Sequence, residues 1–255
     1  MTSVLEKKSE SIKITKNDKM LEVNRNFYEK LWGSSWLLEG HNFNTWSLVQ
    51  KLVKKKQNRL EIAPGLRPRL PIKETHFADI SESALEKLET AGGYVHNASV
   101  CELPFSDESF DLMCALDIIE HVEDDYKAMA EISRCAKDDS ILLLSTPLHE
   151  TCWTPFDEVV GHFRRYSPSR LNYILEMNGF EVIQSGVFGM KPKSSFLVNC
   201  GMWFLKYFPN ISMACYNRVL PHYASHQEPL KLWEGMLPLD NLGEIFMVCK
   251  RKART

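Results

Sequence analysis

The alternation of short apolar runs with helix-like runs constrains this chain more than any other feature of its sequence. From residue 59 onward, runs of strand-like residues are followed by longer segments whose apolar side chains recur at helical spacing. This pattern is typical of βα units around a parallel sheet. Seven segments are predicted to be strands: Arg59 to Ile62, Thr75 to Asp79, Gly93 to His96, Phe110 to Leu116, Ser140 to Ser145, Phe180 to Gly186 and Glu244 to Lys250.

Helix start and stop signals agree with this alternation. Helices are predicted over 83–90, 124–136 and 167–177. The third has Pro168 at its first position, where a missing N–H costs nothing, and Gly179 just past its end. The fold class is therefore α/β, with a doubly wound, mostly parallel sheet.

One domain with appendages is the expected organisation, because 255 residues with 44% hydrophobic and 25% charged composition suit a single large core. Aromatic residues before the first strand recur at roughly helical spacing and predict two covering helices. We divide the chain into a flexible leader (1–22), an N-terminal helical lid (23–56), the core (57–190), a helical cap insertion (191–240) and the last strand (241–255).

Composition excludes several function classes. The formal net charge is -2 and there is no long basic block, which argues against a nucleic-acid partner. The polar leader lacks the apolar stretch of a secretory signal, and the most apolar window, 194–205, is shorter than the ~20 residues that cross a bilayer. Seven cysteines without a CxxC pair fit reduced thiols. We therefore expect a cytoplasmic protein.

The end of the first predicted strand carries a candidate ligand site. Glu61 precedes the small residues Ala63, Pro64 and Gly65, at the sheet edge where open α/β folds bind ligands. Small side chains let the backbone approach a ligand, and the carboxylate could pair with a ligand ammonium group. The alternative is a structural turn with Gly65 at positive φ.

A second carboxylate follows at the end of the next predicted strand. Asp79 comes eighteen residues after Glu61, the spacing at which a carboxylate at a strand tip accepts hydrogen bonds from ribose hydroxyls. The alternative for Asp79 is a helix cap, a role that Ser81 already fills. Two strand tips therefore predict one nucleoside site.

Longer motifs add a family resemblance. The chain reads LPFSDESFDL at 103–112, ALDIIEHVEDD at 115–125, STPL at 145–148 and GHFRRYSPSRLNYILEMNGFEVI at 161–183. Together, over residues 59–183, these resemble the class I S-adenosylmethionine-dependent methyltransferases, particularly the small-molecule type 11 branch. The resemblance implies a Rossmann-like seven-stranded sheet with an antiparallel last strand. It also implies S-adenosylmethionine as methyl donor and a small-molecule acceptor.

The resemblance also implies cofactor contacts. The first strand tip would contact the methionine ammonium and approach the donor closely, the second would hold the ribose, the third would line the adenine, and the fourth would line the methionine and the reacting methyl. The implied residues are Glu61, Ala63, Pro64, Gly65, Asp79, Ile80, Ser99, Val100, Leu116 and Asp117.

Three positions depart from the family pattern. Ala63 and Arg67 replace the first and third loop glycines, and Ser99 replaces the adenine-edge acid. Pro68 and Pro71 punctuate the short stretch after the loop, so the helix that normally follows must be short or missing. The departures leave open a catalytically inactive binding or scaffold protein. A nicotinamide dehydrogenase is disfavoured, because it needs a glycine-rich loop opening a helix that faces pyrophosphate.

Candidate catalytic residues are two histidines. A hydroxyl acceptor must lose a proton, and His121 or His162 could take it. The alternative for each is a hydrogen-bonded packing role. Arg164 and Arg165 could hold an anionic acceptor, whereas the alternative is that one braces a carboxylate such as Asp157.

Aromatic segments before the sheet and before the last strand predict a lid over an apolar or amphipathic acceptor. The alternatives are extra core or a dimer face. An interfacial membrane helix over 196–220 is disfavoured by its few cations. The expected substrate-binding residues are Trp32, Trp36, His41, Arg164, Arg165 and Tyr166.

A metal site is the remaining alternative. Asp117, Glu120 and His121 resemble a cluster that binds a divalent ion in some ubiquinone-type O-methyltransferases. Many metal-free relatives share the Glu-His pair, and no metal is expected. The acceptor atom and the oligomeric state are not readable from the sequence.

Overall fold

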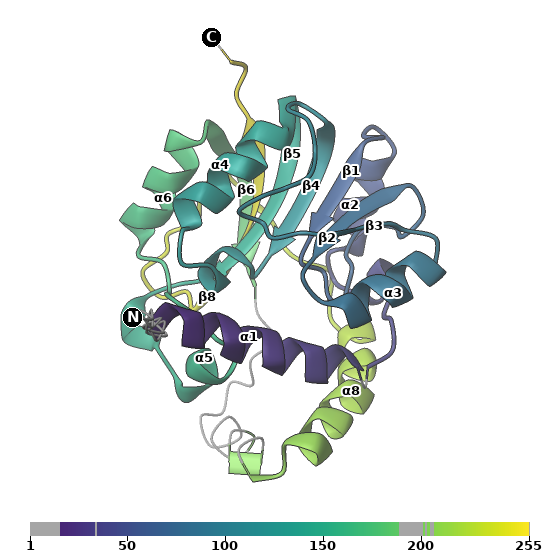
Figure 1. Ribbon diagram of the computed structural model, residues 1–255. Coiled ribbons are helices and arrows are strands. Elements are labelled where there is room, and N and C mark those ends of the chain that lie inside the picture. The colour runs from purple at the N-terminus through teal and green to yellow at the C-terminus, as the bar shows by residue number, and fades with distance from the viewer. Residues whose placement is uncertain (1–15, 34, 189–200, 202, 205–206, 255) are drawn as a thin grey trace, which may run out of the picture.

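The computed structural model describes residues 16–33, 35–188, 201, 203–204 and 207–254. Its centre is one eight-stranded sheet in the order β3-β2-β1-β4-β5-β8-β6-β7 (Figure 1). The strands are β1 (Arg59–Ile62), β2 (Thr75–Asp79), β3 (Tyr94–Asn97), β4 (Phe110–Leu116), β5 (Ala136–Pro147), β6 (Phe180–Val187), β7 (Trp233–Glu234) and β8 (Glu244–Arg251).

The predicted α/β sheet is confirmed, with one strand more than predicted. Strand β8 runs antiparallel to β5 and β6, as the resemblance implied. The additional strand, β7, is a two-residue edge strand that pairs with β6 through Gln184 and Ser185. Two residues carry no readable alternation, so no sequence pattern could have indicated it.

The helices are α1 (Lys16–Gly33), α2 (Trp46–Val53), α3 (Glu82–Thr90), α4 (Asp125–Cys135), α5 (Pro155–Val159), α6 (Pro168–Met177) and α8 (Pro209–Ser225), with short 3-10 turns η1 (Gly40–Asn42), η2 (Ile119–His121) and η3 (Glu150–Cys152). The three helices predicted from start and stop signals are confirmed as α3, α4 and α6. The hydroxyls of Ser81 and Ser167 cap α3 and α6 by accepting the Ala84 and Arg170 N–H groups.

Boundaries differ from the prediction at both appendages. Helix α1 begins at Lys16, inside the stretch predicted as a flexible leader, while residues 1–15 lie outside the described part. The cap is helical only as far as Ser225 within its described residues, since 226–243 contain β7 and connecting turns. As expected from Pro68 and Pro71, residues 63–74 contain no helix.

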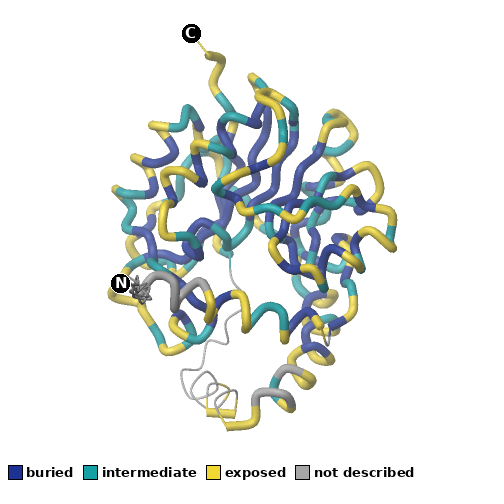
Figure 2. The backbone as a smooth tube through the Cα atoms, viewed as in Figure 1, coloured by how far each residue is buried: buried dark blue, intermediate teal, exposed yellow. Residues whose placement is uncertain are grey.

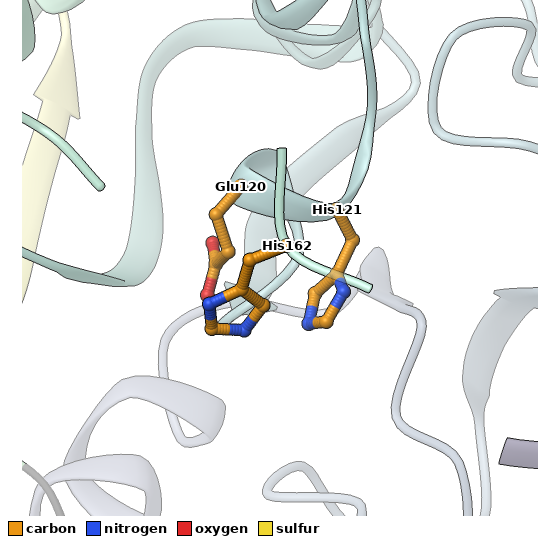
Figure 3. Close-up of side chains that lie close together, drawn as sticks. All are labelled: Glu120, His121 and His162. Carbon is orange, nitrogen blue, oxygen red and sulfur yellow. The ribbon is translucent and has the colours of Figure 1, made fainter. Parts of the chain in front are cut away.

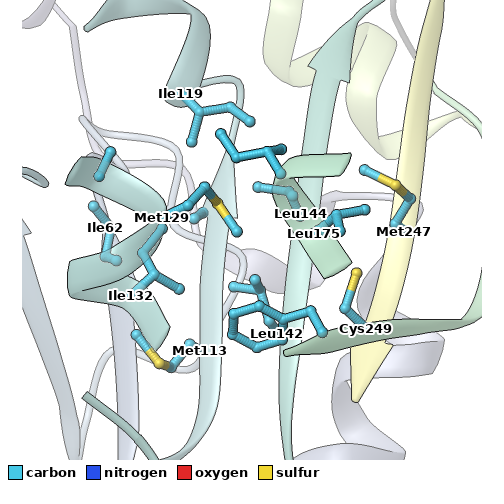
Figure 4. Close-up of a cluster of buried hydrophobic side chains, with 14 of the residues drawn as sticks. Ile62, Met113, Ile119, Met129, Ile132, Leu142, Leu144, Leu175, Met247 and Cys249 are labelled. Atoms are coloured by element: carbon cyan, nitrogen blue, oxygen red, sulfur yellow. The ribbon is translucent and has the colours of Figure 1, made fainter. Parts of the chain in front are cut away.

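Two layers of helices cover the sheet. Helices α4 and α6 pack on one face, where Met129, Ile132 and Leu175 meet sheet residues such as Leu142 and Leu144 (Figure 4). Each fully buried side chain of this size contributes about 1.5–3 kcal/mol relative to exposure. Helices α2 and α3 cover the opposite face in two smaller clusters.

The carboxyl edge of the parallel strands is crossed by helix α1 (Figure 1). Helix α8 lies beyond it and carries mostly exposed residues, whereas the sheet interior is buried (Figure 2). Within the described part of the chain, no helix is both long enough and apolar enough to cross a membrane. The fold therefore places the predicted site under α1.

Candidate functional site

The tips of β1 and β2 are joined through the carboxylate of Asp79. Its Oδ2 accepts the Gly65 N–H at 2.9 Å, and its Oδ1 accepts the Ser81 N–H at 2.9 Å. Burial raises the pKa of Asp79, against the opposing effect of these N–H donors. Each carboxylate oxygen keeps a second lone pair, so Asp79 can still accept a ligand hydroxyl.

Glu61 points to the sheet face that α2 covers. Its two oxygens accept the N–H groups of Arg69 at 2.8 Å and Leu70 at 2.9 Å, which fixes the loop that replaces the missing helix. Burial raises the pKa of Glu61 to about 7, although these two hydrogen bonds oppose the shift. Glu61 therefore braces this loop and titrates near neutral pH.

Two non-glycine residues at strand ends have left-handed backbones. Ala63 after β1 has φ 50°, and Asp117 after β4 has φ 49°. Such a conformation costs roughly 1–2 kcal/mol for a residue with a Cβ. Ser145 holds Asp117, because its hydroxyl donates to Oδ1 at 2.7 Å and its backbone oxygen accepts the Asp117 N–H. Local strain thus marks both predicted cofactor positions.

The remaining predicted cofactor positions are spread along the same edge. Ser99 is exposed after β3, and its hydroxyl accepts the Cys101 N–H at 3.2 Å. Val100 is buried in the main core, Leu116 is half-buried, and Ile80 is 40% exposed. Of these four, Ser99 and Ile80 are the residues that a ligand can reach most readily.

Trp32 of α1 lies directly against the β1 loop. A Cβ built on Gly65 would come within 2.3 Å of the Trp32 ring, and the Arg67 guanidinium lies 5.3 Å from the centre of that ring. Trp32 therefore fills the space beside Gly65 in which the sequence predicted close approach of a ligand. A ligand that approaches Gly65 from this side meets the Trp32 ring.

Tyr28 and Asn24 lie on the same face of α1 as Trp32. Tyr28 stacks on Trp32 with ring centres 5.8 Å apart and meets the His121 ring edge-on at 5.6 Å. Burial, followed by the charges of Glu120 and Asp117, raises its pKa. Tyr28 belongs to the aromatic segment predicted as a lid, whereas Asn24 was not predicted. The spacing 24, 28, 32 is one helical face and could have indicated Asn24.

Three buried groups converge beneath α1: Glu120, His121 and His162, whose potential ligand atoms lie within 4.8 Å of one another (Figure 3). The two imidazole centres are 4.4 Å apart. Oε1 of Glu120 is buried and has no hydrogen-bond partner among the residues that the structure describes. Two nitrogens and one carboxylate oxygen form a donor set that suits a divalent cation.

Hydrogen bonds orient the two histidines differently. His162 donates from Nδ1 to Asp157 at 2.8 Å, which leaves its Nε2 lone pair free. Nδ1 of His121 lies 2.7 Å from the Asn24 amide nitrogen, which also donates to the Val160 carbonyl at 2.9 Å. Burial lowers the pKa of His121 well below its usual value, so this imidazole is neutral.

Asp157 is fully buried and is the centre of a charged cluster. Arg165 donates to both of its oxygens, at 2.9 and 2.8 Å, and the Thr154 N–H and hydroxyl donate at 2.7 Å each. Burial alone would raise the pKa of Asp157, but the hydrogen bonds from His162, Arg165 and Thr154 hold it below its usual range. Asp157 therefore stays ionised beside His162.

The predicted substrate residues are not all brought together. Arg165 braces Asp157, which was the alternative considered for it. Arg164 donates to the Val122 carbonyl at 2.8 Å and pairs with Asp125. Tyr166 is fully buried, and its hydroxyl donates to Asp125. These three side chains are engaged by the protein itself, so we do not place an anionic acceptor on them.

Trp36 and His41 lie on the outer surface of the lid. The Trp36 side chain is 53% exposed, and the His41 ring contacts Trp46 and pairs with Glu39. Of the predicted lid residues, Trp32 alone is recorded in contact with the strand tips among the described side chains. The lid therefore covers the site through one face of α1.

Comparison with known proteins matches this geometry. Residues 62–144 match the family model described as "Methyltransferase domain". A Mycolicibacterium smegmatis protein named "Probable S-adenosylmethionine-dependent methyltransferase" is 31% identical over 97 residues, a segment that covers 37% of this chain and 38% of that protein. The central part of the chain is therefore similar to S-adenosylmethionine-dependent methyltransferases, and the match spans less than half the length of that relative.

Solved structures share the fold at low identity. A Thermotoga maritima S-adenosylmethionine-dependent methyltransferase matches with 18% identity and a TM-score of 0.53, covering 84% of this chain and 92% of that one. A [4+2]-cyclase matches with 13% identity and a TM-score of 0.53, covering 92% and 95%. Methyltransferase domains of this fold therefore share their architecture with a protein named for another reaction, so the reaction must be argued from the site.

Proposed function

We propose that this protein transfers the methyl group of S-adenosylmethionine to a small acceptor at the carboxyl edge of its sheet. The single observation that carries the proposal is the position of Tyr28. Its ring stacks on Trp32, which lies against Gly65, and meets the His121 ring edge-on. One side chain thus links the loop that Asp79 holds to the histidine pair, which supports placing donor and acceptor side by side.

The acidic residues around this cleft suit the donor. S-adenosylmethionine carries a positive sulfonium and a methionine ammonium, which carboxylates at the strand tips attract. Asp79 would accept the ribose hydroxyls through its free lone pairs, and Asp117 would face the methionine. Methyl transfer is an in-line displacement, so the protein acts mainly by holding acceptor and donor in line and excluding water.

His162 is the better candidate for proton removal from the acceptor. Asp157 accepts its Nδ1 proton, leaves Nε2 unprotonated and stabilises the imidazolium that forms when Nε2 takes a proton. His121 is held by Asn24 at Nδ1 and is kept neutral by burial. We assign it a positioning role beside His162. An acceptor with an O–H or N–H group fits this arrangement, and the aromatic lid favours an apolar or amphipathic one.

Trp32 makes α1 a gate in this proposal. Because its ring occupies the space beside Gly65, donor binding requires the helix or at least this side chain to move. Tyr28 and Trp32 would then close over the bound donor and shield it from water.

A divalent cation is the second candidate for the histidine side of the cleft. The partnerless Oε1 of Glu120 is the observation that favours it. Such a cation would be held by Glu120, His121 and His162 and would polarise an acceptor oxygen as a Lewis acid. Calorimetric titration with Mn²⁺ and Zn²⁺ decides between the two, since a His162 base needs no cation and a cation site is lost in Glu120→Gln.

Calorimetric titration with S-adenosylmethionine and with S-adenosylhomocysteine tests the proposal. We expect both to bind, and Asp79→Ala to weaken binding about tenfold or more, because a charge-assisted hydrogen bond contributes about 1.5–3 kcal/mol. Asp138→Ala, an exposed carboxylate on β5, is the matched control and leaves affinity unchanged. Equal affinity of Asp79→Ala and wild type would remove the ribose assignment, and absence of binding would favour the scaffold alternative.

A further inference from the structure

The outward face of α8 carries exposed apolar side chains. Ile211 is 61% exposed, Val219 62% and Tyr223 50%, and Phe208 is also exposed. On a helix of 3.6 residues per turn these positions fall on one side. A surface helix normally turns charged or polar residues to solvent. Exposed apolar side chains along one side of a helix therefore indicate a surface that another apolar surface covers.

The inward face of the same helix already has its partners. Leu220 and Ala224 are buried, and Ala224 packs with Leu38 and Phe43. Asn217 is also buried and accepts a hydrogen bond from Arg67 at 3.1 Å. Since Arg67 also lies over Trp32, α8 is attached to the loop at the mouth of the cleft. The exposed stripe therefore does not serve the fold's own core.

A second aromatic group continues the exposed stripe. Trp203, Phe204 and Tyr207 are each about half exposed and pack on one another and on Phe208 with ring centres 5.2–6.1 Å apart. Tryptophan and tyrosine have an apolar ring and one polar group, the composition that is enriched at lipid–water interfaces. Together with the outward residues of α8 they form what we call the cap face.

The charge of the surrounding sequence has one sign. No acidic residue occurs between Glu181 and Glu228, whereas Lys191, Lys193, Lys206 and Arg218 do, in a chain whose net charge is -2. A second copy of the chain would bring the same positive segment against this face, so self-association is disfavoured by charge. An anionic surface is favoured.

We propose that the cap face docks on an anionic lipid surface. The aromatic and aliphatic side chains enter the interface, and Arg218 of α8 supplies a cation beside them. In the sequence alone, the small number of cations disfavoured lipid attachment. The exposed apolar stripe and the lack of an acidic residue in this stretch of sequence now favour it. The attachment through Arg67 places the cleft mouth beside the lipid layer, where an amphipathic acceptor would be found. This last point rests on the proposed function, but docking itself does not.

Vesicle co-sedimentation of the full-length protein without donor tests the proposal. Vesicles of phosphatidylcholine alone are compared with vesicles that contain 30% phosphatidylglycerol, at about 0.1 M and 0.5 M salt. We expect several-fold stronger partition onto the anionic vesicles, and loss of most of that difference at high salt. Because no methyl transfer is measured, failure of docking and failure of the proposed function are separate results.

Variants locate the docking face. Val219→Gln/Tyr223→Gln removes two exposed apolar side chains, and we expect partition to fall about tenfold or more. Tyr173→Gln/Met177→Gln, which changes two exposed apolar residues of α6, is the matched control and keeps wild-type partition. Sedimentation velocity of the same variants tests the alternative that a second copy of the chain covers this face.

Three results would overturn the proposal. One is partition that is equal on neutral and anionic vesicles, or absent from both. The second is equal loss in the two double variants, which would place docking elsewhere. The third is a concentration-dependent dimer that Val219→Gln/Tyr223→Gln abolishes, which would make the cap face an interface between copies.

Discussion

The donor and acceptor halves of the proposed site are built in different ways. On the donor side, the key contacts join residues close in sequence: Asp79 accepts from Ser81, two residues on, and from Gly65, fourteen residues back. On the acceptor side, Asn24 contacts His121 and Val160 across 97 and 136 positions. Contacts between residues close in sequence leave a motif, so the donor half can be predicted from the sequence. Contacts made by a helix from outside the core leave no such motif, so the acceptor half cannot be predicted in this way.

Removing the base should break the acceptor half alone. We expect His162→Gln to lower turnover about 10²- to 10⁴-fold, the usual contribution of general acid–base catalysis, with donor affinity unchanged within twofold. Asp157→Asn should lower turnover by a smaller factor, because it leaves Nε2 in place but loses the stabilising charge. His41→Gln, an exposed histidine, is the control.

Initial rates of S-adenosylhomocysteine formation and calorimetric donor affinity, taken together on the same preparations, provide the readout for these variants. A parallel loss of turnover and donor affinity in His162→Gln would mean that the histidine supports the fold of both halves and that the comparison fails.

Replacing Trp32, which lies between the two halves of the proposed site, should change the rate of donor association. If its ring blocks the Gly65 loop before the donor arrives, Trp32→Ala speeds donor association about threefold or more in stopped-flow fluorescence, since less of the population must open first. Trp36→Ala, which removes an exposed ring from the same segment, should leave the rate unchanged. Slower association in Trp32→Ala would show instead that the ring receives the donor, and α1 would not be a gate.

The third prediction concerns the donor half of the site, where the ionisation of Glu61 should make both stability and donor affinity depend on pH. Its pKa is raised to about 7 in the folded protein, so the group binds more protons folded than unfolded between about 4.5 and 7. The contribution of Glu61 to the free energy of unfolding therefore falls as pH rises through that window and is constant above it. The proposed donor site adjoins the loop that Glu61 braces, so donor affinity should rise over the same window as the carboxylate ionises and attracts the cationic donor.

The control for this pH dependence is Glu61→Gln, which keeps one acceptor for the Arg69 or Leu70 N–H but cannot ionise. We expect both slopes between pH 5.5 and 8 to flatten in this variant, as measured by chemical denaturation and calorimetry. Identical slopes in the variant and wild type would assign the pH dependence to other groups.

The smallest effect is expected at the strained backbone of the donor loop. Ala63 has φ 50°, so Ala63→Gly removes a steric penalty of roughly 1 kcal/mol while adding a similar entropy to the unfolded chain. We expect the free energy of unfolding to change by less than about 1 kcal/mol, whereas Ala84→Gly inside α3 costs about 1 kcal/mol. A clear loss of stability in Ala63→Gly would show that its methyl group packs rather than strains.

Sequence reasoning predicted the sheet and its helices because both depend on local periodicity and caps, as with Ser81 and Ser167. It also predicted from two prolines that no helix follows β1. It missed the two-residue β7, which has no pattern, and Asn24, whose role depends on how α1 crosses the sheet. Arg165 and Tyr166 were read as acceptor contacts because the motif gives residue types but not the direction in which each side chain points.

Soaking or co-crystallising the protein with S-adenosylhomocysteine tests the central claim most directly. The account predicts the ribose within hydrogen-bond distance of the Asp79 carboxylate, the sulfur between Asp117 and the His121–His162 pair, and the Trp32 ring displaced from Gly65. A ligand bound elsewhere, or a Trp32 ring still seated on Gly65 with the ligand in place, would contradict it.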